Sequence, residues 1–170
     1  VEEYRLLAIN VTTGQVCDAH YRRIPSCRNG WGFFNAQLGW WASDSHRAYF
    51  IDQERGDQLV RVVELNTYTG ATRILFEETS NTHINISLNS EDYPPHMHLP
   101  DTNELIWCSE RSGWAHLYLY DLDNGSLKNT VTQGNWLVRN VLHFDTKRRE
   151  VAIQTACRVA GKDPYYRDIC

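Results

Sequence analysis

One pattern recurs along the chain: a polar segment opens on Asp, an apolar stretch follows, and a short turn ends in glycine. Apolar stretches of this kind follow Asp44, Asp101 and Asp145. Glycine-ended turns occupy residues 9–14, 65–70 and 122–125, and their glycines are separated by 56 and 55 residues. A repeat of four short strands occupies about 40–50 residues in propellers. The spacing therefore predicts propeller blades with insertions in the connecting loops.

The clearest single unit lies at residues 104–125. Residues 116–122 alternate in character, which on a strand places every second side chain in the core. The step Asn124-Gly125 follows, and Asn-Gly between two such runs is a strong signal for a hairpin because glycine accepts a positive φ. No window of a dozen residues holds the continuous spacing of an amphipathic helix. These features predict antiparallel sheet.

We therefore expect an all-β fold, a partial β-propeller with about three blades of four-stranded antiparallel sheet. The predicted blades lie near residues 4–35, 36–80 and 96–140, and a further blade begins at 141–170. Three blades do not close a ring, and open strand edges favour pairing with a neighbour. We expect residues 1–170 to be one fragment of a propeller domain in a longer protein, with a possible homo-oligomer as a consequence.

Composition limits the classes of partner. Six Trp, nine Tyr and one Met favour stiff residues that pack well on sheets. The net charge of −4 and the lack of a basic stripe give no reason to expect a nucleic-acid partner. No apolar run approaches the roughly 20 residues needed to cross a bilayer, so no membrane partner is predicted.

Two segments resemble a known family. Residues 107–120 read Trp-Cys-Ser-Glu-Arg-Ser-Gly-Trp-Ala-His-Leu-Tyr-Leu-Tyr, and residues 131–138 read Val-Thr-Gln-Gly-Asn-Trp-Leu-Val. Both resemble the N-terminal β-propeller of the dipeptidyl peptidase IV group of serine peptidases, which is related to the prolyl oligopeptidases. Further similarity lies at residues 76–80, 84–86 and 163–167, so the resemblance spans about residues 36–168.

The resemblance implies a parent enzyme whose chemistry lies in a C-terminal α/β-hydrolase domain. Such a domain presents its nucleophile in a Gly-x-Ser-x-Gly elbow, because the Ser sits on a strained turn. This sequence contains no such step, and Ser109, Ser112 and Ser126 lack the flanking glycines. We expect no catalytic residue in this chain and no hydrolase domain. Neither the residues nor the resemblance indicates a cofactor.

The implied function is the propeller portion of a dipeptidyl-peptidase-IV-like exopeptidase, which removes N-terminal dipeptides from a peptide substrate. The propeller would gate and shape the cleft beside the hydrolase domain of the same protein. The alternative is a non-catalytic propeller that acts as a binding or scaffolding module. A Gly-x-Ser-x-Gly step in the parent reading frame would separate the two.

In the family, a pair of glutamates in the propeller binds the substrate's amino terminus, because a buried ammonium needs charge-assisted hydrogen bonds. Glu2-Glu3 and Glu77-Glu78 are the adjacent pairs in this chain, but both lack the family's sequence context. We interpret both as surface carboxylates. The substrate-binding residues stay unassigned.

Several other side chains have both a functional and a structural interpretation. His96 and His98 could hold a metal from one side of a strand, but further ligands are lacking nearby, so no metal site is predicted. Glu110 and Arg111 could shape a ligand pocket, and we expect them instead to pair or cap within a turn. His116 is expected to be a structural histidine bonded to a neighbouring turn.

Aromatic residues gather near the first predicted blade, at Trp31, Phe33, Phe34, Trp40 and Trp41. They could line a binding surface, but packing between blades is the simpler interpretation. Residues 84–93 correspond to a family region near the edge of the substrate cleft. The sequence differs there in detail, so no single residue is transferred.

Cysteines and glycosylation motifs leave the compartment open between cytoplasm, periplasm and secretion. The five cysteines, an odd number without Cys-x-x-Cys, do not indicate a complete disulfide framework. Cys108 is expected to be a small buried residue, whereas Cys17 and Cys27 could bridge a loop. Asn-x-Ser/Thr motifs begin at Asn10, Asn85 and Asn124, and they matter only in a glycosylating compartment.

Overall fold

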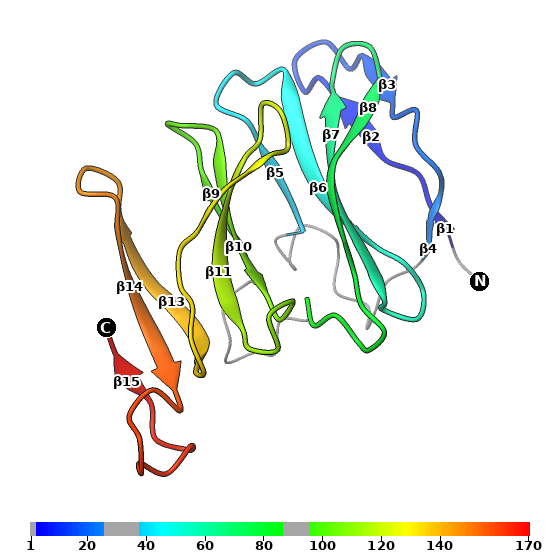
Figure 1. Cartoon of the computed structure of the whole chain (residues 1–170). Coiled ribbons are helices and arrows are strands. Elements are labelled where there is room, and N and C mark those ends of the chain that lie inside the picture. The colour runs from blue at the N-terminus through cyan, green and yellow to red at the C-terminus, as the bar shows by residue number, and fades with distance from the viewer. Residues whose placement is uncertain (1–2, 26–37, 87–95) are drawn as a thin grey trace. The chain divides into compact units, whose positions relative to one another are not determined.

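The computed structural model describes residues 3–25, 38–86 and 96–170, and every regular element in them is a β-strand (Figure 1). The chain divides into two compact units, residues 1–85 and 86–170. The strands form antiparallel sheets of two to four strands in which neighbours along the chain mostly pair. The predicted all-β architecture with four-stranded antiparallel sheets is confirmed.

The first unit is centred on one four-stranded sheet. Its strands are β5 (Gly39–Trp41), β6 (Arg47–Gln53), β7 (Leu59–Asn66) and β8 (Thr72–Thr79), in that order across the sheet. The middle strands β6 and β7 pair over seven residues, from Arg47 opposite Asn66 to Gln53 opposite Val60. Their side chains are almost all buried or half-buried, as apolar β-branched and aromatic strands in the centre of a sheet should be.

Four short strands precede this sheet. They are β1 (Glu3–Tyr4), β2 (Leu7–Ile9), β3 (Val16–Asp18) and β4 (Ile24–Pro25), paired as β1 with β4 and β2 with β3. Ile24 joins Phe50, Val63 and Leu65 in one buried cluster, and half-buried Leu6, Ala19 and Tyr21 pack against it. Two-stranded ribbons are marginal alone, so this apolar contact with the four-stranded sheet stabilises the segment.

The second unit contains a four-stranded sheet of β9 (His96–Leu99), β10 (Glu104–Ser109), β11 (His116–Asp121) and β12 (Leu127–Thr130). Leu105, Trp107 and Leu117 are at most 1 % exposed. Alternate residues of β10 and β11 point to opposite faces, and both faces are buried over most of their length.

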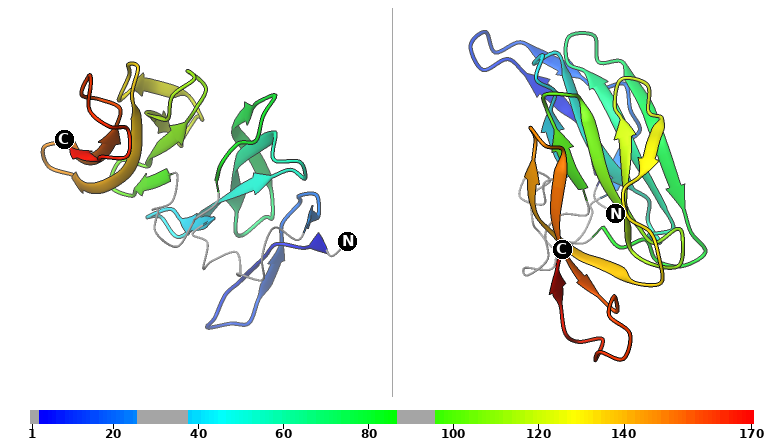
Figure 2. Two further views of the ribbon diagram at one scale, coloured as in Figure 1. Left: turned by 90° about the horizontal axis from the view of Figure 1, so that it is seen from below. Right: turned by 60° about the vertical axis from the view of Figure 1, so that its left-hand side comes forward.

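A three-stranded sheet follows, made of β13 (Leu137–Asp145), β14 (Glu150–Ala156) and β15 (Asp168–Ile169). Figure 2 shows the short β15 beside β14, at the red end of the chain. The register of β13 shifts at two places against β14, which bends and twists the long strand. Val138 and Ile153 pack with Leu99, Ile106 and Leu117 of the preceding sheet to form the core of this unit.

The glycine-ended turns of the sequence repeat share one geometry. Four residues before each glycine is an Asn or Asp whose side-chain oxygen accepts backbone N–H groups of the turn: Asn10, Asn66 and Asp121. Each turn ends on a glycine with a φ of 71°, 75° or 76°. The sequence repeat therefore corresponds to a repeated hairpin turn.

The division of these sheets into blades of one ring, near residues 4–35, 36–80, 96–140 and 141–170, stays a prediction. Strand β13 begins at Leu137 and pairs only within the last sheet.

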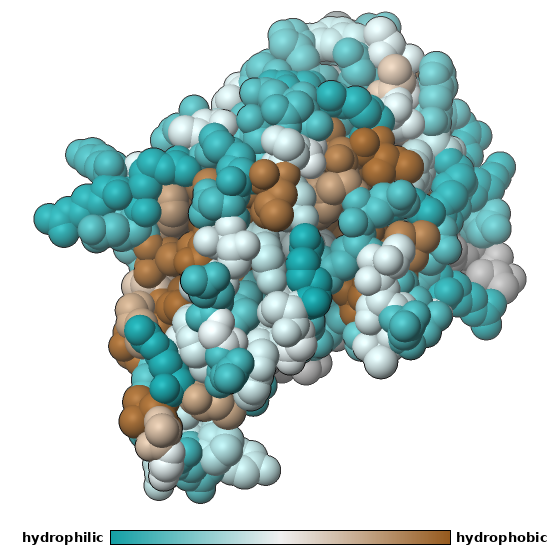
Figure 3. All heavy atoms as spheres, viewed as in Figure 1, coloured by the Kyte–Doolittle hydropathy of each residue, from teal (hydrophilic) through white to brown (hydrophobic). Residues whose placement is uncertain are grey.

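The surface in Figure 3 is mostly hydrophilic with scattered apolar side chains. Among the described residues no helix has the length and apolar character that crossing a bilayer requires.

Candidate functional site

The turn between β10 and β11 carries the most distinctive motif of the sequence. Residues 110–115 connect the strands, and the N–H of Gly113, at φ 86°, donates to the carbonyl oxygen of Glu110 at 2.8 Å. Glycine is favoured here because the left-handed conformation costs other residues about 1–2 kcal/mol. The turn is therefore tight, and it is flanked by two buried strands.

Arg111 folds back from this turn over the strands. Its Nε donates to Ser109 Oγ at 2.9 Å, and its Nη1 donates to the Tyr120 hydroxyl at 2.7 Å. The guanidinium carbon lies 4.4 Å from the centre of the Tyr118 ring, within the range of a cation–π contact. Arg111 thus holds the turn against its own sheet, as capping requires.

Glu110 and Arg111 were expected to pair or cap within the turn, and the structure shows capping without an ion pair between them. Both side chains are exposed, and in the part of the chain that the structure describes the Glu110 carboxylate has no ion pair. The planar guanidinium instead makes directional hydrogen bonds to two hydroxyl groups and lies over an aromatic ring. Glu110 is left facing solvent at the tip of the turn.

His116 is a structural histidine, as expected. It is 1 % exposed, with Nδ1 3.0 Å from Thr132 Oγ1 and Nε2 2.9 Å from the Gly134 carbonyl oxygen. Its ring meets Trp136 edge-to-face at a centroid distance of 4.9 Å. The first family-like segment is therefore bound directly to the second, which explains why Thr132, Gly134 and Trp136 accompany the histidine.

Of the two candidate glutamate pairs, Glu77-Glu78 lies wholly within the described residues. Glu77 pairs with Arg61 at 2.6 Å, and Glu78 is its neighbour on β8, so their side chains leave opposite faces of the strand. Glu3 is exposed on β1, and Glu2 lies outside the described residues. Two carboxylates that diverge in this way cannot converge on one ammonium group.

His96 and His98 lie on the same face of β9, as their spacing predicts. The His96 ring stacks on Trp107 at 6.3 Å, and His98 forms a hydrogen bond with Asn103. Burial lowers the pKa of His98, and that hydrogen bond opposes part of the effect. The described residues contain no group of three or more His, Cys, Asp or Glu side chains that could hold a metal.

The aromatic cluster is only partly within the described residues. Trp40 is half-buried and lies 5.8 Å from Tyr49 between ring centres, whereas Trp41 is 51 % exposed. Trp31, Phe33 and Phe34 lie outside the described residues. So do residues 87–93 of the segment 84–93, and Cys27 of the two cysteines considered for a loop disulfide.

Two buried carboxylates were not singled out from the sequence. Asp52, fully buried on β6, accepts hydrogen bonds from the Tyr21 hydroxyl at 2.8 Å and Arg22 Nη2 at 2.6 Å. The pKa of Tyr21 is raised to about 12, because burial and the neighbouring Asp52 both disfavour the phenolate. These bonds fix the N-terminal segment to the first four-stranded sheet.

Glu104, the second, is 2 % exposed at the start of β10. It accepts from Lys128 Nζ at 2.6 Å and Thr102 Oγ1 at 2.5 Å, and its other ion-pair partner is Arg149 at 2.8 Å. Burial alone would raise the pKa of Glu104, but these bonds outweigh it and lower the pKa to about 2. The sequence could have indicated this buried carboxylate, because Glu104 is a charged residue directly beside an apolar stretch.

A hollow of about 260 Å³ lies beside the N-terminal strands. Its lining residues are Arg5, Leu6, Asp18, Ala19, Tyr21 and Arg23. Arg5 and Asp18 form an ion pair with each other. The family-like segments do not contribute to this hollow.

Comparison with solved structures defines the class of fold. The crystal structure of Porphyromonas gingivalis dipeptidyl peptidase 4 matches 97 % of this chain with a TM-score of 0.72 and 16 % sequence identity. The chain covers 21 % of that protein. At this level of identity the match establishes the fold, and the predicted partial β-propeller is confirmed.

Comparison of sequences establishes the family. The model described as "Dipeptidyl peptidase IV (DPP IV) N-terminal region" matches residues 36–167. The chain therefore belongs to the dipeptidyl peptidase IV N-terminal region family, and the resemblance noted in its two central segments is confirmed.

Curated relatives match a shorter stretch. Dipeptidyl peptidase 4 of Arthroderma otae is 49 % identical and that of Trichophyton rubrum 46 % identical, each over 41 residues. Each alignment covers 24 % of this chain and 5 % of the relative. The chain thus spans only a small part of the length of these peptidases.

Proposed function

We propose that this chain is the propeller portion of a dipeptidyl-peptidase-IV-like serine exopeptidase and that it shapes and gates the cleft through which peptides reach the catalytic domain. That α/β-hydrolase domain belongs to the same longer protein and supplies the nucleophile. The family match over residues 36–167 is the observation that carries this proposal. The lack of a Gly-x-Ser-x-Gly step in residues 1–170 supports it.

The β10–β11 turn is our candidate for a part of the cleft wall. The bonds of Arg111 to Ser109 and Tyr120, together with those of His116 to Thr132 and Gly134, hold the turn from both sides. A wall that positions a peptide must be rigid, because a displacement of 1 Å at a binding group is costly to catalysis. The exposed Glu110 and the half-buried Trp114 are the side chains that this turn can offer to a peptide.

The test uses the full-length parent protein and an X-Pro chromogenic dipeptide substrate. Arg111→Ala removes the hydrogen bonds and the ring contact that hold the turn. We expect a roughly 3- to 10-fold increase in KM with kcat changed less than about twofold, since the lost contacts position the substrate and take no part in the chemistry. Arg111→Lys keeps the charge without the planar fork and should give an intermediate KM.

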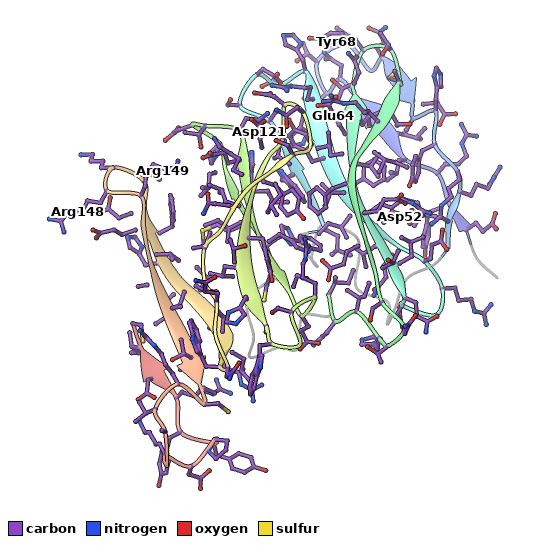
Figure 4. All side chains as sticks on the ribbon, in the orientation of Figure 1. Asp52, Glu64, Tyr68, Asp121, Arg148 and Arg149 are labelled. Atoms are coloured by element: carbon purple, nitrogen blue, oxygen red, sulfur yellow. The ribbon has the colours of Figure 1, made fainter. Side chains whose placement is uncertain are left out.

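Arg148→Ala is the matched control. Arg148 lies on the β13–β14 turn, 73 % exposed, with a single ion-pair contact of 3.9 Å to Glu150 (Figure 4). Its removal should leave both constants unchanged. Equal effects of the two alanine variants would refute a cleft-wall role for the β10–β11 turn. A parent protein that does not hydrolyse the substrate would favour the scaffolding interpretation.

A further inference from the structure

The turn between β2 and β3 has two features of a modification site. Residues 10–12 read Asn-Val-Thr, the acceptor motif for N-linked glycans. The turn is open to solvent: Val11 is 97 % exposed, and nothing lies within 4 Å of the position that a Cβ would occupy at Gly14. The motif thus lies at an exposed hairpin tip.

Comparison with the β7–β8 turn shows which positions of the β2–β3 turn are needed for the turn to form. Asn10 Oδ1 accepts the N–H groups of the second and third residues after it at 3.0 Å each, and so does Asn66 Oδ1 in the β7–β8 turn. The fourth residue, Thr13 or Thr69, accepts the N–H two positions later in both turns. These positions are explained by hairpin formation.

The third position of the turn has no such structural role. Thr12 occupies it in the β2–β3 turn, and Tyr68 occupies it in the β7–β8 turn. Tyr68 is 68 % exposed, and its ring lies 4.9 Å from the His46 ring between centroids (Figure 4). Tyr68 has no hydroxyl group on its Cβ, so the same turn forms without the Thr hydroxyl at this position. The hydroxyl of Thr12, which the acceptor motif requires, is not explained by the fold.

The other two Asn-x-Ser/Thr motifs, at Asn85 and Asn124, are less accessible to a glycosyl transferase. Asn124 Nδ2, the nitrogen that would carry the glycan, donates to Asp121 Oδ2 at 3.4 Å. Asn85 lies between the buried Ile84 and Ile86. In the described residues, by contrast, neither Asn10 Nδ2 nor Thr12 Oγ1 takes part in a hydrogen bond.

We propose that Asn10 carries an N-linked glycan and that the protein consequently passes through a glycosylating compartment. The co-substrate is an oligosaccharide carried on a polyprenyl diphosphate. Asn10 Nδ2 attacks C1 of the reducing-end sugar, the N–C1 bond forms as the C1–O bond breaks, and the lipid diphosphate leaves with the bonding electrons. The amide proton passes to a base of the transferase. This proposal is independent of the peptidase function.

The test is peptide mass spectrometry on the full-length protein, expressed from its complete reading frame in eukaryotic cells. Treatment with an N-glycosidase in ¹⁸O-water should convert Asn10 to a labelled Asp, and the protein should migrate faster on a gel after treatment. An Asn10 peptide recovered wholly unmodified, with or without modification at Asn124 or Asn85, would overturn the proposal.

Two substitutions at Thr12 test the proposal while keeping the Asn10 side chain that stabilises the turn. Thr12→Ala destroys the acceptor motif but keeps the Asn10 side chain that stabilises the turn, so circular dichroism should be unchanged while the Asn10 glycan is lost completely. Thr12→Ser retains a hydroxyl group and should keep the glycan. A carbohydrate signal on the Asn10 peptide that survives Thr12→Ala would also contradict the proposal.

Discussion

Gly14 and Gly70 end two turns of the same geometry in different surroundings. Both have a positive φ, 71° and 75°. A Cβ at Gly14 would meet nothing within 4 Å, whereas a Cβ at Gly70 would come within 2.2 Å of the Asp18 carbonyl oxygen. Close approach at Gly70 also allows its carbonyl to accept the N–H of His20 at 2.7 Å. Gly14 is required by its turn alone, whereas Gly70 also brings its turn into contact with the segment at Asp18 and His20.

This contrast predicts unequal costs for the same substitution. Gly14→Ala should lower the free energy of unfolding by about 1–2 kcal/mol, the cost of a left-handed alanine. Gly70→Ala should lower it by at least about 1 kcal/mol more, because the methyl group must displace the Asp18 backbone. Denaturant unfolding of both variants measures the difference. Equal losses would mean that the Asp18 contact carries no energy.

The contacts of a single residue were predictable for a side chain on an alternating strand. They were not predictable for a long side chain that can reach several partners. His116 alternates with apolar neighbours, so a buried, bonded ring was predictable. Arg111 can reach many partners from a turn, and its bonds to Ser109 and Tyr120 depend on strand register. Asp52 and Glu104 were missed because their charged partners Arg22, Lys128 and Arg149 lie 24 to 45 residues away in the sequence.

Glu104 ties together three elements of the second unit. Its partners are Thr102, Lys128 on β12, and Arg149 on the turn that joins β13 to β14 (Figure 4). The carboxylate is 3 % exposed, whereas Lys128 and Arg149 are 45 % and 42 % exposed. A buried carboxylate with three donors from separate elements stabilises their packing only while it is ionised.

Stability should consequently fall in acid. The pKa of Glu104 is about 2 in the folded protein and 4.5 ordinarily, so its contribution is complete above pH 4.5 and is lost as the pH falls toward 2. A pKa difference of this size corresponds to about 3 kcal/mol in the free energy of unfolding. Glu104→Gln should remove that part of the decline in unfolding free energy between pH 5 and pH 2.

Glu150→Gln provides the control for this titration. Glu150 is 69 % exposed and contacts Arg148 only at 3.9 Å. The variant should therefore keep the acid dependence of the unmodified protein. Parallel pH profiles for Glu104→Gln and the unmodified protein would show that the three donors do not favour the ionised carboxylate.

Among the elements, strands with alternating or continuous apolar character were predictable and short strands were not. Strands β6, β7, β10 and β11 follow the repeat, and the turns at Gly70 and Gly125 mark their hairpins. The N-terminal strands are only two or three residues long, too short for a period-two pattern to develop. Their pairing depends on contact with Phe50 and Val63, which local sequence does not reveal.

At the scale of the molecule, the chain carries family motifs without a nucleophile elbow. The two central motifs fold onto each other through His116, and residues 1–170 contain no Gly-x-Ser-x-Gly step. In α/β-hydrolases such a step presents the nucleophile that a serine peptidase needs. The proposed function therefore assigns hydrolysis to another part of a longer protein.

The 170-residue chain alone should therefore not cleave an X-Pro chromogenic dipeptide at any pH. The measurement is release of the chromophore by purified chain, beside the full-length parent as positive control. A serine-directed inhibitor should abolish the parent's activity. Turnover by the short chain that persists after the same inhibitor would contradict the assignment of catalysis to a separate domain.

The order of strands has a consequence for biosynthesis. In both four-stranded sheets each strand pairs with its neighbour along the chain, and the turns between them are stabilised by their own Asn, Asp and glycine residues. Each sheet can thus assemble from contacts that are close in sequence, which is the arrangement that shortens the search for the native state. A ribosome releasing this chain from its amino end can complete one sheet before the next has been translated.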